Sequence, residues 1–553
     1  MKGNRTSKVK GLSLLALSTA LTASLAACGN DGNNGNGNNA GPSGSGSSAS
    51  SSAATQAAGG VDTSKPVTLK VMLFGDKPVD MDKVLQKFEA DTKDTINTKL
   101  DIEWNPNADH KQKLTLKMTS GEAVDAAFDA PWMSLNQNVT LGYYQQLDKY
   151  FNNDEYPGLK KAFSEDFLNA NKINGHIYSI PLTNAFYDID VVYIRKDLRE
   201  KYGMEPIQSY EDLQKYLDNV QQNEKGMIPF ALKGDRGFYK LFNLEDKITN
   251  AKLIAGTSPG FYVYLSEDGK KVIGATTLGD DASKYANLPA PYTDPYYFYP
   301  QYDKAVEWNK YVQKDVLSEK DPSILFVGGK SAANESTING AAQIRQRLKS
   351  ALPNADIEAF VYNSRMRNME PGAIGTDYKA WNDIVIPVTS KNADRTMKFF
   401  DWLFSSQENH DLLELGIQGE HWTPDGDRYY KMTDKTSNYI FPTYEMTWTP
   451  TMSRINGDND EATLKLLDYQ SKEDTYYLQP LSGFTFNVEP VKSELAKLSP
   501  IAAQFDPVFK SGLSKDWKET ATKMNKQMAS SGLEKVRQEL INQVQAFLDA
   551  GGK

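Results

Sequence analysis

The spacing of apolar residues switches along the chain between a strand-like and a helix-like pattern, starting near residue 67. Residues 67–74 (VTLKVMLF) form an apolar-rich run that stops at Gly75-Asp76, which predicts a buried strand. Apolar residues then recur at i, i+3, i+4 and i+7, at Met81, Val84, Leu85 and Phe88. This spacing predicts an amphipathic helix, and we expect Asp80 to be its N-cap.

The same two kinds of signal alternate to the end of the chain. Ser209-Tyr210-Glu211-Asp212 has the spacing of a capping box, and Asp268-Gly269 is a hairpin turn signal between two apolar runs. The remaining elements predicted in this way are strands at 100–104, 261–265 and 271–274, and helices at 114–118, from 393 and along 533–547. This alternation, without a repeat period, predicts an α/β fold.

The first 27 residues are typical of a secretory signal. Four basic residues precede an apolar stretch (11–27) that is too short to span a bilayer comfortably. The stretch ends at Leu25-Ala26-Ala27-Cys28, which is similar to a bacterial lipobox, whose cysteine carries the lipid. The alternative is an ordinary signal peptide beside a chance cysteine. Cys28 is the only cysteine of the 553 residues, so the fold has no internal disulfide.

The segment after Cys28 has no residues that can build a core. Residues 29–60 contain only small and polar types and one proline, so we expect a flexible tether over 28–64 with a reach of roughly 30 Å. The body from residue 65 onward is too long for one core and predicts two or three domains. Loss of the four basic signal residues changes the net charge from -9 to -13, which argues against a nucleic-acid partner.

Four segments, in this order, resemble the family 1 extracellular solute-binding proteins, the group that includes maltose-binding protein. They are NGHIYSIP at 174–181, YIRKDL at 193–198, IVIPVTSKN at 384–392 followed by MKFFDWL at 397–403, and LGIQGEHW at 415–422. The segment 484–547 is similar to a C-terminal extension of LipO-type lipoproteins, and its periodicity predicts helices. We expect this extension to pack on one lobe.

The resemblance implies a two-lobed periplasmic-binding-protein-like fold of type II, with ligand held between the lobes. The chain is expected to cross between lobes near 182–190 and near 380–384. The implied division is a first lobe from 65–184 and about 383–430, a second from 185–382 and about 431–483, and the extension at 484–553.

The resemblance also implies the function of a substrate-binding lipoprotein of an ABC importer. Such a protein is expected to capture a carbohydrate, an oligosaccharide, by hinge closure and to deliver it to the permease subunits. It implies a monomer held by the lipid on Cys28 at the outer face of a Gram-positive cell membrane, with no cofactor.

Sugar binding needs a flat aromatic ring for the apolar face of a pyranose, and carboxylate, amide or guanidinium groups for its hydroxyls. Residues of these types at predicted strand ends and crossings are the candidate ligand contacts: Asp76, Asp129, Trp132, Asn184, Tyr187, Arg236, Trp381, Asn382 and Trp422. Structural roles stay open for some of them. Asp76 suits a helix cap and Trp132 suits the core, while the Tyr- and Pro-rich run 292–302 lines a groove or forms a rigid surface loop.

Other functional classes receive less support from the residues. A binder of peptide or another non-sugar solute remains an alternative. A secreted glycoside hydrolase needs two carboxylates about 5–10 Å apart, and although 71 acidic residues offer pairs, no hydrolase motif is present. His110, His176, His410 and His421 lack a metal-ligand spacing, so no metal site is expected.

Overall fold

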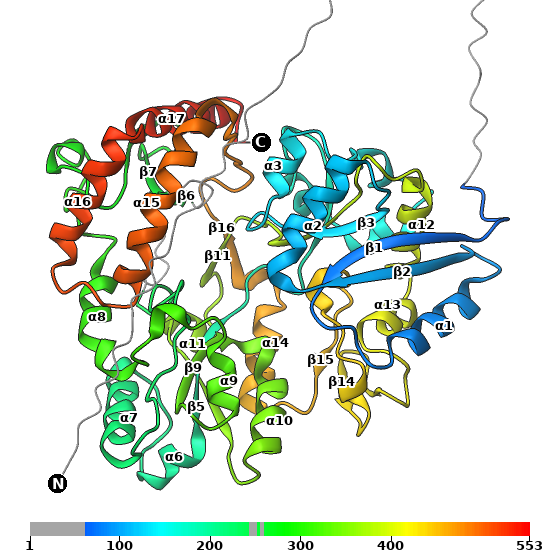
Figure 1. Cartoon of the computed structure of the whole chain (residues 1–553), viewed down its shortest axis with the longest axis horizontal. Coiled ribbons are helices and arrows are strands. Elements are labelled where there is room, and N and C mark those ends of the chain that lie inside the picture. Colours follow the sequence, from blue (N-terminus) through cyan, green and yellow to red (C-terminus); the bar gives the residue numbers. More distant parts are fainter. Residues whose placement is uncertain (1–60, 243–250, 255–258, 553) are drawn as a thin grey trace, which may run out of the picture. The chain divides into compact units, whose positions relative to one another are not determined.

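A computed structural model describes residues 61–242, 251–254 and 259–552 of the protein (Figure 1). The expected signal peptide, Cys28 and most of the expected tether lie outside the described residues. All described residues belong to one of the two units into which the chain divides, residues 59–553. Among them, no helix is both long enough and apolar enough to cross a membrane.

The first lobe is built on a five-stranded mixed sheet. Its order is β2 (Thr98–Asn105), β1 (Val67–Phe74), β3 (Ala126–Asp129), β12 (Asn382–Val385) and β4 (Ser179–Leu182). β1 is parallel to β2 and β3, whereas β12 is antiparallel to β3 and β4. The predicted strand at 67–74 is confirmed, and its last four residues are buried because helices cover the sheet.

Helices from two distant parts of the chain complete the main core of this lobe. They are α1 (Met81–Thr92), α12 (Ala393–Leu403) and α13 (Gln407–Glu414), while α2 (Asn107–Ser120) packs in a smaller core of the lobe through Leu114 and Met118. Phe88 of α1, for example, contacts Phe399 and Trp402 of α12 edge-to-face, with ring centroids 5.6 and 4.8 Å apart. Residues 439–452 also pack into this core, which departs from their predicted place in the second lobe. The reason is that Tyr439, Phe441, Met446 and Met452 bury their apolar side chains here.

The second lobe is centred on a three-stranded antiparallel sheet, in the order β10 (Ile357–Val361), β5 (Asp190–Arg195) and β9 (Ala333–Thr337). Alternate residues of β5 point to opposite faces, so the strand serves two cores. Val192 and Ile194 join one core with α7 (Tyr210–Asn223), and Val191 and Tyr193 join the other with α10 (Ala341–Ala351). Ser209 caps α7 as predicted, because its side chain accepts a hydrogen bond from the Asp212 N–H.

Strand membership shows where the chain passes between the two sheets. It leaves the first sheet after β4 and enters the second at β5, and it returns to the first sheet at β12. These two crossings therefore lie at 183–189 and just before residue 382, in agreement with the expected ranges 182–190 and 380–384. The chain passes between the lobes a third time after Met452 of the first core, because Ile455 already packs in a core of the second lobe. A short parallel pair, β11 (Ile374–Thr376) and β16 (Tyr476–Leu478), accompanies the second crossing.

The C-terminal helices share a third core with a hairpin from the middle of the chain. The hairpin consists of β7 (Phe261–Leu265) and β8 (Val272–Thr276), as predicted around Asp268-Gly269, with β6 (Ala251–Ile254) beside β7. The helices are α15 (Lys492–Lys510), α16 (Trp517–Ser530) and α17 (Leu533–Asp549), drawn orange to red beside the green strands in Figure 1. The extension thus contributes about half of the buried residues of this core, so it does more than pack on the surface of a lobe that is complete without it.

The Tyr-rich run 292–302 belongs to this third core. Tyr292, Tyr299 and Tyr302 are buried in it, and Phe298 stacks on Tyr262 of β7 with ring centroids 4.0 Å apart. The run therefore packs against β7, and its buried tyrosines are not available to line a groove.

A buried ion pair ties α17 to the turn after β8, which gives a test of the third core. Both terminal nitrogens of Arg537 donate to the Asp280 carboxylate, at 2.7 and 2.8 Å, and both side chains are almost completely buried. Arg537→Met leaves this carboxylate uncompensated, so we expect a loss of about 3–5 kcal/mol in the free energy of unfolding, measured with urea.

The control is Lys284→Met, which removes an exposed ion pair to Glu534 on the same helix. We expect this variant to lose less than about 1 kcal/mol. Similar losses in the two variants would contradict the structural role of the buried pair.

Candidate functional site

The sheet register of the first lobe places several predicted ligand contacts at one edge. Asp383 of β12 lies opposite Asp129 of β3, and Asn382 lies opposite Leu182 of β4. The ends of β1, β3 and β4 and the start of β12 therefore share an edge, as in sheets whose ligands bind beyond the strand ends. The predicted residues that this edge carries are Asp76, Asp129, Trp132, Asn184, Trp381 and Asn382.

Trp132 and Trp381 form an exposed aromatic pair at this edge. Their exposed fractions are 50% and 52%, and the Trp132 Nε1–H donates to the Trp381 carbonyl oxygen at 2.6 Å. Trp132 also contacts buried Phe128, with ring centroids 5.9 Å apart. The alternative of Trp132 as a core residue is thus wrong, and both indoles present apolar surface to solvent.

Asp129 supports the loop that carries Trp132. Its carboxylate is buried and accepts hydrogen bonds from the Ala130 and Ser134 N–H groups at 2.8 and 3.0 Å. The Asn138 amide and the Tyr144 hydroxyl donate to its other oxygen at 2.9 and 2.5 Å. The Asp129 carboxylate therefore accepts four hydrogen bonds from groups of its own lobe, whereas the sequence predicts it as a ligand contact.

Asp76 and Asn382 are nearer the surface. Asp76 is exposed, and its alternative role as a helix cap is wrong because α1 begins at Met81 with Asp80 at the N-cap position. Asn382 is half-buried as the first residue of β12. Both lie at the edge that carries the tryptophan pair.

The second lobe contributes a network of charged side chains at the start of β5. Asp190 accepts from Lys240 Nζ at 2.6 Å, from Arg236 at 3.3 Å and from the Tyr187 hydroxyl at 2.9 Å. Glu335 lies 3.5 Å from Arg236 Nε. Arg236 and Lys240 are each about one-third exposed, so the network has cationic groups at its surface and carboxylates below.

Burial sets the protonation of this network. It raises the pKa of Glu335 to about 7, although the positive charge of Arg236 lowers this pKa. It likewise raises the pKa of Asp188 to about 7, with a further contribution from Asp190, and Asp188 also accepts a hydrogen bond from the Asn339 amide. Two predicted residues, Tyr187 and Arg236, thus contact two acidic groups that sequence reasoning missed, Asp190 and Glu335, and Asp188 lies buried beside this network.

A polar pocket of about 170 Å³ lies where the two lobes meet. The crossing residue Asn184 lines it, as do Trp448 and Glu414 from the first lobe and Asn339 and Gln470 from the second. The amide of Gln470 donates to Asn339 at 2.7 Å and its oxygen accepts from the Ile189 N–H. The pocket therefore offers an aromatic ring together with several amide groups.

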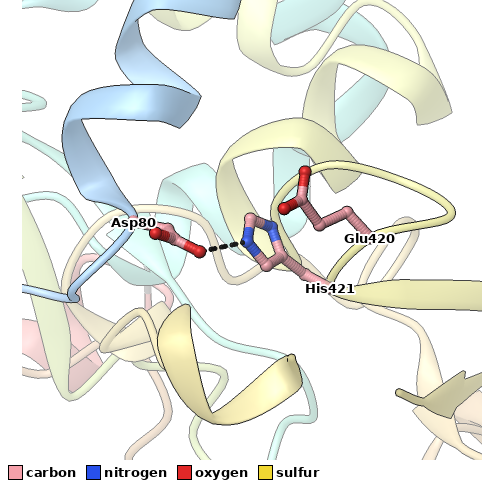
Figure 2. A group of neighbouring side chains, drawn as sticks. All are labelled: Asp80, Glu420 and His421. Carbon is pink, nitrogen blue, oxygen red and sulfur yellow. Dashed lines mark hydrogen bonds and ion pairs between the residues drawn. The ribbon is translucent and has the colours of Figure 1, made fainter. Parts of the chain in front are cut away.

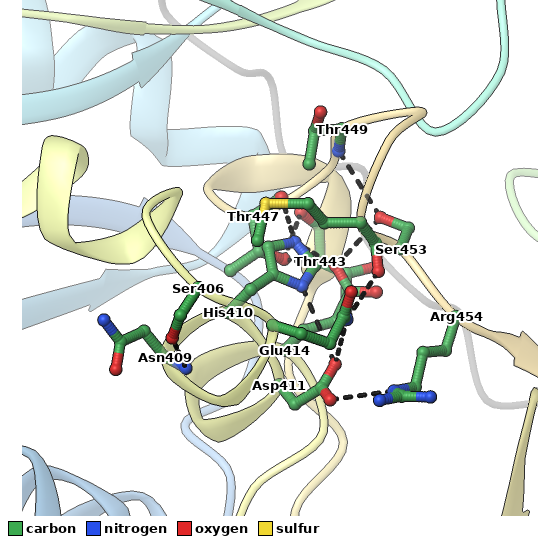
Figure 3. Close-up of polar contacts among 12 residues, drawn as sticks. Ser406, Asn409, His410, Asp411, Glu414, Thr443, Thr447, Thr449, Ser453 and Arg454 are labelled. Atoms are coloured by element: carbon green, nitrogen blue, oxygen red, sulfur yellow. Dashed lines mark hydrogen bonds and ion pairs between the residues drawn. The ribbon is translucent and has the colours of Figure 1, made fainter. Parts of the chain in front are cut away.

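Buried hydrogen bonds fix the first-lobe wall of this pocket (Figure 3). Glu414 accepts from the hydroxyls of Thr447 and Ser453 at 2.9 and 3.2 Å, and Arg454 donates to Asp411 at 2.8 Å. Behind them, His410 is completely buried. Burial opposes a charge on His410, but the carboxylates of Glu414 and Asp411 raise its pKa overall.

Trp422 lies away from solvent. It is only 3% exposed, its Nε1–H donates to the Gly416 carbonyl at 3.0 Å, and the Arg454 guanidinium lies 5.4 Å from the ring. Trp422 therefore supports Arg454 in the pocket wall, and the ring has almost no surface for the predicted direct contact.

Asp80, Glu420 and His421 bring three possible metal donors within 4.8 Å of one another (Figure 2). His421 Nδ1 accepts a hydrogen bond from the Ile417 N–H at 2.9 Å, so the ring proton is on Nε2 and faces Asp80 at 3.1 Å. A metal on Nε2 would require an imidazolate ring. Glu420 is already paired with Lys83 and Lys435, so this donor set does not fit a metal.

The same contacts explain why Asp80 makes no side-chain cap bond, contrary to its predicted role. Its carboxylate is turned toward His421 and Asn438, and these hydrogen bonds lower its pKa despite partial burial. The cluster ties the start of α1 to the start of β13 (Trp422–Asp425).

The chain belongs to the bacterial extracellular solute-binding protein family, whose model matches residues 83–419. A second model, of a domain of unknown function, matches residues 480–549. The fold is accordingly the two-lobed fold of solute-binding proteins, with an added C-terminal helical region.

Individual relatives agree with this assignment. A carbohydrate ABC transporter substrate-binding protein of Streptococcus pneumoniae is 25% identical over 88% of this chain and 91% of its own length. The crystal structure of the N-glycan transport solute-binding protein of S. pneumoniae is similar with a TM-score of 0.65, at 21% identity over 88% of this chain and 99% of that one. The structure of a solute-binding protein of Bifidobacterium longum infantis, described as HMO-binding, is similar with a TM-score of 0.56. The two sequences are 18% identical, and the match covers 89% of this chain and 100% of that one.

The pH dependence of stability tests the environment of Asp383, which is buried directly opposite Asp129. Burial, reinforced by Asp129 and partly offset by the Ser179 hydroxyl, raises the pKa of Asp383 to about 8. The native state keeps a proton that the unfolded chain releases near pH 4, so stability present at low pH is lost as the pH rises toward 8. The slope from this group is at most about 1.4 kcal/mol per pH unit.

Asp383→Asn keeps the shape and removes the titration, so its melting temperature is expected to depend less on pH between 5 and 8 than that of the wild type. Asn382→Ala, which changes the neighbouring residue of β12 without adding or removing an ionisable group, is the control and should keep the wild-type slope. An unchanged slope in Asp383→Asn would show that Asp383 is ionised in the native state.

Proposed function

We propose that the protein captures a carbohydrate, longer than one sugar unit, between its two lobes. The observation that carries this proposal is the pair of half-exposed indoles, Trp132 and Trp381, at the edge of the first sheet. Soluble proteins rarely leave large aromatic rings together at a surface without a partner for them. The C–H face of a pyranose is such a partner, because it is flat and apolar while its rim is polar.

Groups for the sugar hydroxyls accompany the two rings. The pocket between the lobes provides amides from Asn184, Asn339 and Gln470, and the network around Asp190 provides Arg236 and Lys240. Donors and acceptors of both lobes would bind one ligand only when the lobes approach each other, which favours hinge closure. The named ligands of a related structure, Man5GlcNAc in the S. pneumoniae N-glycan protein, support an oligosaccharide.

The family and the curated relative support a place in an ABC importer. We propose that the closed form delivers its ligand to the permease subunits, and that the lipid on Cys28 holds the protein at the outer face of a Gram-positive cell membrane. The binding role includes no catalysis. The two lobes and the extension are proposed to divide near the crossings at residues 184 and 382 and near residue 484.

Ligand binding is testable with residues 61–553 and a panel of neutral oligosaccharides that includes Man5GlcNAc and maltooligosaccharides. A ligand raises the melting temperature because bound free energy adds to stability, by about 2.7 kcal/mol at one hundred times Kd. We expect a shift with at least one glycan and no release of reducing sugar. A shift with peptides alone would overturn the carbohydrate assignment, and hydrolysis would overturn the binding role.

The aromatic pair has its own prediction. Trp381→Ala is expected to weaken glycan affinity by about 1–3 kcal/mol, measured by calorimetry, while the unliganded melting temperature stays close to that of the wild type because the ring is half-exposed. The matched control is Trp402→Ala, which removes a ring packed on Phe88 in the first core and should lower the unliganded melting temperature. Unchanged glycan affinity in Trp381→Ala would exclude its ring from the site.

A further inference from the structure

The C-terminal extension contacts the loop that carries Arg236. The Phe238 N–H donates to the carbonyl of Lys510, the last residue of α15, at 2.7 Å. Gly237 has φ +51°, and a Cβ at this position would overlap the main chain of Lys510. The backbone that directly follows Arg236 therefore lies against the end of α15 without an intervening side chain.

The turn after α15 is itself fixed to the second lobe. The Asn309 amide donates to the Ser511 carbonyl at 2.8 Å, and Gly512 lies against the backbone of Ala305 in α8 (Pro300–Trp308). Trp517, at the start of α16, donates its Nε1–H to Asp303 of the same helix at 2.8 Å. These contacts give α15 a defined position from which its last carbonyl can hold the loop.

The other side of the Arg236 loop is also held by main-chain contacts. Gly234 packs against the carbonyls of Val316 and Leu317, and its N–H donates to the Glu319 carbonyl at 2.8 Å. Two glycines thus bracket Arg236, and each one lies against a neighbouring backbone. Glycine is flexible by itself, so the position of this loop depends on the two surfaces that enclose it.

The beginning of the extension touches the opposite half of the site. Lys379 donates to the Phe484 carbonyl and, at 2.6 Å, to the Thr485 hydroxyl. Lys379 lies two residues before Trp381, and Thr485 lines a small pocket of about 50 Å³ together with Pro131 and Asp383. The extension therefore contacts loops next to both the aromatic pair and the charged network.

On the basis of the proposed function, we propose that the C-terminal helical extension is a positioning element of the ligand site, which holds Arg236 through the contact of Gly237 and Phe238 with Lys510. This assigns a role to the region that matches a domain of unknown function. From this loop position Arg236 reaches Asp190 and Glu335, so displacement of the loop moves a cationic group of the site.

The first experiment needs no ligand. Hydrogen exchange of the peptide 234–242 is compared in the full chain between Gly237→Ala and Gly269→Ala. Both glycines have positive φ, at +51° and +69°, but Gly269 has open space around its Cα whereas Gly237 faces Lys510. We expect about tenfold faster exchange in Gly237→Ala and no change in Gly269→Ala. Equal exchange in the two variants would overturn the proposal.

If Gly237→Ala fails to fold, Asn309→Ala replaces it, because this variant loses only the side-chain hydrogen bond to Ser511. It should accelerate exchange at 234–242 in the same direction but less. No acceleration in this variant, with a folded protein, would also overturn the proposal.

The second experiment asks whether the extension acts through Arg236, with Man5GlcNAc as the probe in calorimetry. Gly237→Ala and Arg236→Gln are each expected to weaken binding about tenfold, and the double variant should be no weaker than Arg236→Gln alone. Additive losses would show that the contact acts on affinity by another route. Absence of any Man5GlcNAc binding by the wild type would count against this glycan as ligand, while the exchange result would still decide the positioning role.

Discussion

The antiparallel insertion of β12 between β3 and β4 is the constraint on which the site depends. These three strands come from residues 126–129, 179–182 and 382–385, so the chain must leave the first sheet, build the second and return before the first is complete. The register that pairs Asp383 with Asp129 also fixes Trp381 beside Trp132. One hydrogen-bonded strand thus determines both the crossings at 183–189 and before residue 382 and the aromatic pair.

Buried carboxyl groups are the chief electrostatic feature of both lobes. Asp129 is surrounded by four donors, whereas burial, reinforced by the neighbouring Asp129, raises the pKa of Asp383 to about 8. In the second lobe, Arg236 and Lys240 compensate Asp190 and Glu335. Asp129 and Asp190 have fixed hydrogen-bond and ion-pair partners, which hold these two carboxylates in a defined arrangement.

The third core links the middle of the chain to its end. Residues 261–302 and the helices α15 to α17 bury one apolar cluster, so the hairpin and the helices need each other for a complete core. The end of α15 approaches the Arg236 loop at Gly237 and α8 at Gly512, and these close backbone approaches are possible because glycine has no Cβ. A distant segment can in this way contribute to the geometry of the ligand site.

The sequence by itself determined several helices and strands and the family of the protein. Local periodicity predicted β1, α1, α7 and the β7–β8 hairpin, and motif order predicted the fold, because both depend on short-range patterns. Only the tertiary structure decided which of the predicted ligand contacts reach the surface. Asp129 and Trp422 are buried, while Trp132 and Trp381 are half-exposed. It also brought in Asp188, Glu335 and Trp448, which lie in no recognisable motif. Burial and charge pairing depend on contacts between segments that are tens to hundreds of residues apart, such as Asp190 with Lys240 and Trp132 with Trp381, and a one-dimensional pattern does not specify these contacts.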